Sequence, residues 1–134
     1  PKINKAIEVQ VDYWNLEKDG RRLVSIHLLN SMGFLLFATG NLNYCSLVPD
    51  PWVRKKYPVG LFRTSCTIPA SLLNNGVHSI DIYINGVGDK DNILLQRNIL
   101  SFDVQESDED RSEYLGEWIG AIRPKLLWQT QQLE

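Results

Sequence analysis

Apolar and polar residues alternate with a period of two through most of this chain, and this pattern constrains the fold more than any other feature. In residues 6–14, for example, Ile7, Val9 and Val11 alternate with Glu8, Gln10 and Asp12. The same period recurs in four later ranges: 23–30, 61–68, 77–85 and 99–105. Because neighbouring side chains on a strand point to opposite faces, the pattern predicts strands with one buried face.

About seven or eight short strands in a chain of 134 residues favour an all-β fold. We expect one β-sandwich domain over residues 1–134, of the immunoglobulin-like or jelly-roll kind. Residues 30–33 read as a hairpin turn into a continuous apolar run at 34–38, which we expect to be buried on both faces. A last extended segment is expected at 118–129.

One stretch interrupts the strand pattern, at residues 69–76, with the sequence Pro-Ala-Ser-Leu-Leu-Asn-Asn-Gly. Pro69 suits the first position of a helical turn, which we expect over 70–73. Leu72 or Leu73 would then cover one end of the core, and the Asn-Asn-Gly sequence tolerates the left-handed backbone needed to leave the turn. We interpret the stretch as a corner that carries the chain from one sheet to the other.

Composition excludes several classes of protein. The chain is 43% hydrophobic, and its formal net charge of −2 comes from mixed charges without a basic patch, so no nucleic-acid partner is expected. No window holds the roughly 18 apolar residues of a membrane span, and no signal sequence is recognisable. Because the chain begins at Pro1, we expect it to be a fragment of a longer protein. Cys45 and Cys66 could form a bridge, but two reduced thiols, one of them buried, are favoured.

Three motifs occur in order along the chain: "GLFRTSCTIPASLLNNG" at 60–76, "LSFDV" at 100–104 and "GAIRPKLLW" at 120–128. Together they resemble the C-terminal carbohydrate-binding domain of the ATPase subunit of O-antigen polysaccharide ABC exporters, the Wzt type. The resemblance covers most of the chain, and its most specific parts are the corner and the closing Arg-Pro-x-Leu-x-Trp pattern.

The resemblance implies a β-sandwich attached to a cytoplasmic nucleotide-binding domain that works with membrane subunits at the inner membrane. Such modules recognise the non-reducing end of a finished, lipid-linked polysaccharide before export. The resemblance also implies a homodimer that exchanges its C-terminal strand, with interface residues Ile122, Arg123, Pro124, Leu126 and Trp128. This chain lacks the phosphate-binding loop of an ATPase, so that part of such a protein is not present here. The absence fits a fragment and equally a stand-alone relative.

A sugar-binding surface needs planar apolar groups for the faces of the sugar rings and fixed polar groups for the hydroxyls. If the strands that carry Ser25, Arg63 and Asp81 lie in one sheet, alternation places six such side chains on its outward face. These are Ser25, His27, Arg63, Ser65, Asp81 and Tyr83. The alternative is an ordinary solvated face.

A second candidate is the long loop between 39 and 60, which carries Asn41, Asn43, Tyr44, Trp52 and Tyr57. Trp52 could stack on a sugar or cover the core, and we favour the cover. Trp14 and Trp128 are expected to pack, and Trp118 is expected at the dimer contact.

Neither catalysis nor a cofactor is predicted. His27 and His78 are too isolated for a metal site, and the acidic run 106–113 lacks a calcium-loop pattern. That run is better explained as a hinge before an exchanged strand. We find no nucleophile motif and no carboxylate pair that the sequence places at glycosidase separation. The leading hypothesis is therefore a non-catalytic glycan-binding module; the alternatives are a purely structural dimerisation module and a glycan-modifying enzyme.

Overall fold

The computed structural model describes residues 1–86, 89–107 and 119–133, with only the backbone described at 89–93. This part of the chain contains six strands and one short 3₁₀-helix. They are β1 (Ile7–Asn15), β2 (Arg22–Asn30), β3 (Leu35–Gly40), η1 (Pro51–Arg54), β4 (Gly60–Ile68), β5 (Gly76–Gly86) and β6 (Asp89–Val104).

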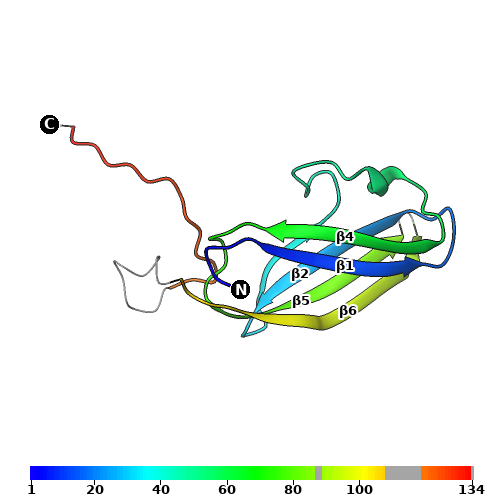
Figure 1. The fold of residues 1–134 in the computed structure, drawn as a ribbon, viewed down its shortest axis with the longest axis horizontal. Helices are drawn as coiled ribbons and strands as arrows, with labels where there is room; N and C mark the ends of the chain where they lie inside the picture. The colour runs from blue at the N-terminus through cyan, green and yellow to red at the C-terminus, as the bar shows by residue number, and fades with distance from the viewer. Residues whose placement is uncertain (87–88, 108–118, 134) are drawn as a thin grey trace.

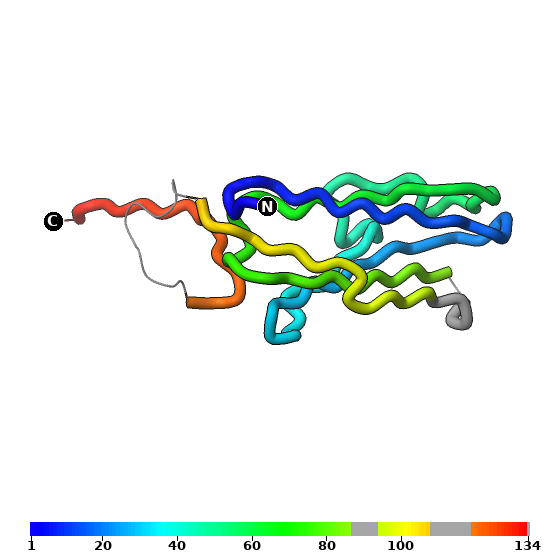
Figure 2. The backbone as a smooth tube through the Cα atoms, turned by 60° about the horizontal axis from the view of Figure 1, so that its bottom comes forward, coloured from blue at the N-terminus to red at the C-terminus, as the bar shows by residue number. Residues whose placement is uncertain are grey.

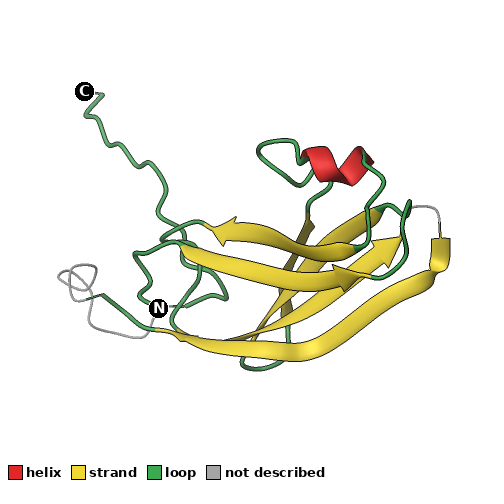
Figure 3. Ribbon diagram, turned by 45° about the vertical axis from the view of Figure 1, so that its right-hand side comes forward, coloured by secondary structure: helices red, strands yellow, loops and turns green. Residues whose placement is uncertain are grey.

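The strands form two antiparallel sheets packed face to face (Figures 1 and 3). One sheet has two strands in the order β1-β4, and the other has four in the order β3-β2-β5-β6. The predicted β-sandwich is therefore confirmed. The described part has six strands rather than seven or eight, because 119–133, in the last expected extended segment, form no strand. β6 is also longer than the expected range 99–105, since it begins at Asp89.

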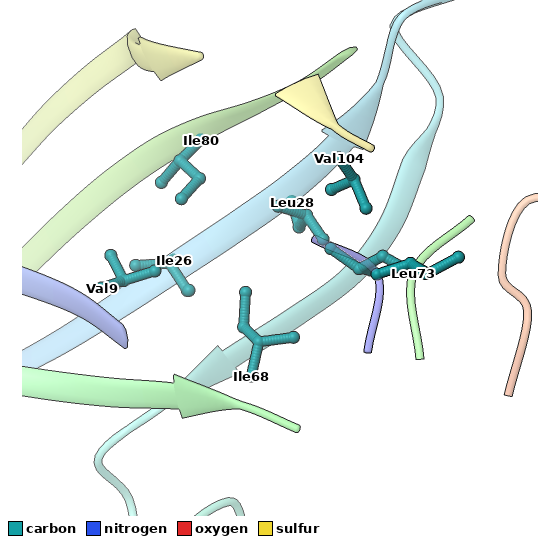
Figure 4. Packing of buried hydrophobic residues seen from close by; sticks show 8 residues of the cluster. Val9, Ile26, Leu28, Ile68, Leu73, Ile80 and Val104 are labelled. Atoms are coloured by element: carbon teal, nitrogen blue, oxygen red, sulfur yellow. The ribbon is translucent and has the colours of Figure 1, made fainter. Parts of the chain in front are cut away.

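The inward-facing residues of both sheets form the core, as the alternation predicted. Val9 from β1, Ile26 and Leu28 from β2, and Ile80 from β5 are buried and pack together (Figure 4). A second cluster at the other end of the sheets contains Val11, Tyr13, Val24, Tyr57 and Ile84. Burial of this apolar surface is the main force that holds the sheets together.

The apolar run at 34–38 differs from its prediction. We expected burial on both faces, but Leu35 is 53% exposed. The reason is that β3 is an edge strand that pairs only with β2. The two-stranded sheet is too narrow to cover the whole of its four-stranded partner. The turn before β3 is as expected: Asn30 donates its backbone N–H to Phe34 O, and Gly33 has a φ of +81°.

The corner at 69–76 crosses between the sheets as predicted, since β4 and β5 belong to different sheets. Leu73 is buried and covers one end of the core (Figure 4). The helical turn is wrong, however. The chain makes a short turn in which Ser71 is left-handed, with φ of 58°, and Gly76, with φ of +124°, opens the next strand. Only glycine adopts that second conformation readily.

Both terminal segments lie against this corner. The backbone N–H of Ser71 donates to Ile3 O at 2.9 Å, and the N–H of Arg123 donates to Leu72 O at 2.7 Å. Leu73 and Ile122 form an antiparallel bridge. The chain beyond Lys125 then leads away from the sandwich (Figures 1 and 2). The two most distinctive motifs of the resemblance, far apart in sequence, therefore lie side by side.

Candidate functional site

The outward face of the four-stranded sheet brings together four of the predicted residues. Ser25 and His27 lie on β2, and Asp81 and Tyr83 lie on β5. In the antiparallel register Ser25 is opposite Tyr83, and His27 is opposite Asp81. All four alternate with buried residues, so they point away from the core. We refer to these four residues as the β2–β5 face.

Two aromatic rings pack together on the β2–β5 face. The His27 and Tyr83 ring centroids are 4.4 Å apart, with 37° between the ring planes. Both side chains are half-buried, so each ring keeps part of its surface open to solvent. Diagonal neighbours across an antiparallel pair are within reach of such side chains. The pair provides a rigid, partly apolar surface beside two polar groups.

The carboxylate of Asp81 is held by the neighbouring strand. The backbone N–H of Asn98 in β6 donates to Asp81 Oδ1 at 2.7 Å. This contact forms where the β5–β6 register is irregular, between Ile80 and Ile82. Asp81 is therefore oriented by the backbone rather than by a mobile side chain.

On its other side the β2–β5 face borders small residues of β3. Ala38 lies opposite His27, and Gly40 lies opposite Ser25. A Cβ added at Gly40 would lie 2.9 Å from both Ser25 Oγ and the carbonyl oxygen of Val24. Glycine at this position therefore lets β3 pair closely with β2. Small residues here also leave the β2–β5 face open along the β3 edge.

The structure corrects the predicted grouping for two residues. Arg63 and Ser65 lie on β4, which belongs to the two-stranded sheet. Their side chains point to solvent from that sheet, on the side of the sandwich opposite to the β2–β5 face. The outward orientation of both is as expected, but they cannot share one surface with His27 and Tyr83. Alternation predicts which face of a strand is exposed, but not which sheet the strand joins.

Arg63 forms an ion pair on its own sheet. Its Nε donates to Asp12 Oδ1 at 2.7 Å, and its Nη2 donates to Asp12 Oδ2 at 3.0 Å, across the β1–β4 pair. This two-point hydrogen bond lowers the pKa of the Asp12 carboxyl below its usual value. Because both side chains are exposed, the pair contributes little to the free energy of folding.

The loop candidates have different roles. Trp52, in η1, is 37% exposed and packs edge-on against Tyr57 and Phe62, each at 5.2 Å between ring centroids. This packing agrees with the favoured role as a cover over the core. Tyr57 is buried, and its pKa is raised by burial and by its hydrogen bond with Tyr13. Tyr44, by contrast, is 85% exposed.

The sequence predicts packing roles for three tryptophans. Trp14 is 66% exposed on the outer face of the two-stranded sheet, opposite Leu61, which is also exposed. Trp128 is 88% exposed on the segment that leads away. Neither packs into the core: Trp14 points outward from β1, between the buried Tyr13 and Asn15, and Trp128 lies on the exposed C-terminal segment. Trp118 and residues 108–113 lie outside the described residues.

The remaining predicted interface residues divide into two groups. Ile122 and Arg123 lie along the corner, and Arg123 Nη1 forms an ion pair with Glu106 Oε1 at 3.2 Å. Pro124 and Leu126 are exposed. The first group is therefore anchored to its own chain, and the chain from Pro124 onward presents exposed side chains.

A cavity of about 620 Å³ lies between the sheets under the loop at 41–50. Its walls include Val9, Ile26, Phe37 and Ile68. Asn41 and Asp50 also line it, but their polar atoms hold the loop: Asn41 Oδ1 accepts from Val24 N–H, and Asn41 Nδ2 donates to Asp50 Oδ2. A mainly apolar cavity in which the Asn41 and Asp50 side chains are already hydrogen-bonded suits a sugar poorly.

Both cysteines also line this cavity, and both are free thiols. Cys45 is exposed, whereas Cys66 is half-buried. Burial raises the pKa of the Cys66 thiol, which favours the unreactive protonated form. Reduced thiols were the favoured interpretation of the sequence.

His78, the second isolated histidine, is buried on the inward side of β5. Its Nδ1 lies 2.9 Å from Gly76 O, and its ring stacks on Phe102 at 5.6 Å. Burial lowers the pKa of His78. Within the described residues no group of three or more His, Cys, Asp or Glu side chains is placed to hold a metal ion. The same part of the chain has no helix with the length and hydropathy to cross a membrane.

Comparison with known proteins is informative about the fold. No family model matches the chain, and no curated protein sequence matches it. Among solved structures, the crystal structure of the C-terminal domain of Wzt matches with a TM-score of 0.69, over 97% of this chain and 72% of that chain. The two folds are the same. Sequence identity is only 12%, so the match establishes the fold of this chain and does not by itself establish its function.

Proposed function

We propose that this chain is a non-catalytic module that binds a polysaccharide through the β2–β5 face. The observation that carries the proposal is the packed His27–Tyr83 pair beside the oriented carboxylate of Asp81. An aromatic surface can take the C–H face of a sugar ring, while Ser25 and Asp81 hydrogen-bond its hydroxyls. The shared fold with the Wzt C-terminal domain supports the same conclusion.

The biological role we infer is selection of a finished, lipid-linked O-antigen-type polysaccharide for export. In this role the module works beside the nucleotide-binding and membrane subunits of an ABC transporter, on the cytoplasmic face of the inner membrane. A module that favours the completed end of the glycan makes export depend on completed synthesis. Tenfold discrimination requires only about 1.4 kcal/mol, so one or two hydrogen bonds suffice.

A matched pair of variants tests the binding surface. Tyr83→Ala removes half of the aromatic pair, and Arg63→Ala removes a large exposed side chain on the outer face of the other sheet. We expect Tyr83→Ala to weaken glycan binding at least about tenfold, and Arg63→Ala to leave it unchanged. A glycan array followed by calorimetry on the best ligand measures both. Equal affinities in the wild type and Tyr83→Ala would rule out the β2–β5 face.

A second proposal concerns assembly: two copies form a dimer by exchanging the segment from Leu126 onward. Leu126, Leu127 and Trp128 are all exposed, and the segment makes no strand within the described chain. The two-stranded sheet leaves one edge of β1 and one edge of β4 without a partner in the described residues. A sheet edge of this kind readily accepts a strand from another chain. The corner contacts of Ile122 and Arg123 fix the point from which the segment departs.

Sedimentation analysis of a shortened chain tests the exchange. Ending the chain after Lys125 removes the exposed segment but keeps the contacts with the corner, so we expect a folded monomer where the full chain is a dimer. Gln129→Ala, within the same segment, is the control that keeps the dimer. A dimer that persists after truncation would contradict the exchange. A truncated monomer that still binds glycan would show that binding and dimerisation are separate properties.

A further inference from the structure

The chemistry of the β2–β5 face also indicates which kind of sugar it takes. This inference rests on the glycan-binding function proposed above. It starts from Asp81, the acidic residue among the four side chains of the face. The question is whether that carboxylate has a cationic partner within the protein or keeps its charge available to a ligand.

The position of Asp81 is built into the fold by a bulge in β6. Ile80 pairs with Leu100 and Ile82 pairs with Gln96, so the three residues 97–99 lie opposite the single residue Asp81. Within the bulge Asn98 has a φ of 49°, a left-handed conformation that costs free energy for a residue other than glycine. Bulges often redirect strands beside functional sites. Here the bulge brings the Asn98 N–H to Asp81 Oδ1.

A backbone N–H orients the carboxylate but does not neutralise it. An ionised carboxylate has lone pairs on both oxygens, and a single donor at Oδ1 occupies one of them. The described residues contain no ion pair for Asp81, in contrast to the Asp12–Arg63 pair on the other sheet. Asp81 therefore presents a fixed acceptor and a negative charge to whatever lies on the face.

The surrounding side chains supply little positive charge. Across β2 the direct neighbour of Asp81 is His27, and β3 contributes Ala38 beyond it. No outward position of β2, β3 or β5 carries Lys or Arg. Further along β6, Asp103 lies opposite Val77 and adds a second carboxylate. Among the side chains that the structure describes, the cation closest in the sheet register is the exposed Arg97, in the bulge itself.

We propose that the β2–β5 face selects an uncharged sugar residue, whose hydroxyls donate to Asp81, and rejects a residue that carries phosphate, sulfate or carboxylate. An anionic group on this face would lie beside the oriented carboxylate of Asp81, and two negative charges in direct proximity repel one another. A hydroxyl, by contrast, donates a charge-assisted hydrogen bond to the carboxylate. The selection is therefore made by the charge of the terminal residue.

An array of matched glycans tests the proposal with the full chain. Each neutral hexose terminus is printed beside its uronic acid and its 6-phosphate, on the same underlying oligosaccharide. We expect binding of the neutral form to exceed that of both acidic forms by at least about tenfold, and the preference to weaken as salt is added.

Two variants identify the source of the preference. Asp81→Asn keeps an oxygen that accepts from the Asn98 N–H but removes the charge, so we expect it to bring the neutral and acidic ligands within about threefold of one another. Arg97→Ala should leave neutral binding unchanged. Thermal unfolding of each variant checks that the sandwich is intact.

Two results would overturn the proposal. One is a wild-type chain that binds an acidic terminus as tightly as the neutral one or more tightly, particularly if Arg97→Ala abolishes that binding. The other is an Asp81→Asn variant whose preference equals that of the wild type. Both leave the proposed glycan-binding function standing. An array on which no glycan binds would instead overturn that function, and this inference with it.

Discussion

The outer faces of the two sheets both carry a carboxylate in the middle of a strand, and these two carboxylates have different partners. Asp12, on β1, is held at two points by the Arg63 guanidinium across the two-stranded sheet. Asp81, on β5, accepts from the backbone N–H of Asn98 in the four-stranded sheet. An ion pair uses both charges within the protein, whereas a backbone donor fixes the geometry and leaves the charge to a ligand.

The same contrast applies to the aromatic residues. On the four-stranded sheet, His27 and Tyr83 pack on one another and are half-buried, so they form a rigid surface. On the two-stranded sheet, Trp14 lies exposed beside Leu61 without a second aromatic ring in the register position opposite. Exposure alone therefore does not identify a binding residue; side chains that are fixed by their neighbours are better candidates.

The outer faces of both sheets depend on the same core between the sheets. The largest expected effect is therefore a core substitution that destabilises both sheets. Leu28 is fully buried, and Leu28→Ala leaves a cavity between the sheets. We expect the free energy of unfolding to fall by about 2–5 kcal/mol. Hydrogen exchange should show that all six strands lose protection together. A loss of protection that is confined to β2 and β5 would mean that the two sheets unfold separately, as independent units.

A glycine variant should affect one face only. Gly40→Ala places a Cβ against Ser25 Oγ and the Val24 carbonyl oxygen, so β3 must shift beside the β2–β5 face. We expect glycan affinity to fall about tenfold, which corresponds to about 1.4 kcal/mol. Gly60→Ala on β4 is the matched control, because the nearest atom to its Cβ is 3.8 Å away on Phe62. Equal glycan affinities for Gly40→Ala and Gly60→Ala would contradict the claim that glycan binds to the four-stranded sheet and not to the two-stranded sheet.

The smallest expected effect is the pH dependence contributed by Asp12. Its pKa is lowered in the folded chain, so the stabilisation from the Arg63 pair is present above the unfolded value of 3.8 and is lost as the pH falls through the lower folded value. We expect an NMR carboxyl titration to show a pKa below 3.8, and Arg63→Ala to restore the ordinary value. An Asp12 pKa that does not change in Arg63→Ala would show that the pair does not persist in solution.

The sequence predicts the fold of this chain well, because alternation is a local signal. The inward sets of β1, β2, β4 and β5, and the role of Leu73 at the end of the core, all follow from local patterns. Two of the features that escaped prediction depend on pairing between distant segments. These are the membership of β4 in the two-stranded sheet and the bulge at Asn98.

The candidate site was predicted only in part, because its composition also depends on which strands pair. Ser25, His27, Asp81 and Tyr83 share a face because their strands are neighbours, and the sequence had no means to exclude Arg63 and Ser65 from it. The donor to Asp81 is a backbone N–H, which carries no side-chain signature. Its only trace in the sequence is Asn98, a residue type that tolerates the left-handed conformation.

The most direct test of the central claim is an NMR titration of the isotope-labelled chain with the best glycan from the array. We predict chemical-shift changes clustered on Ser25, His27, Asp81 and Tyr83, with the β3 residues beside them and the β6 bulge, and none at Asp12, Trp14 or Arg63. Changes centred on Trp14 and Arg63, or on the loop around Tyr44, would contradict it and place the binding surface elsewhere on the sandwich.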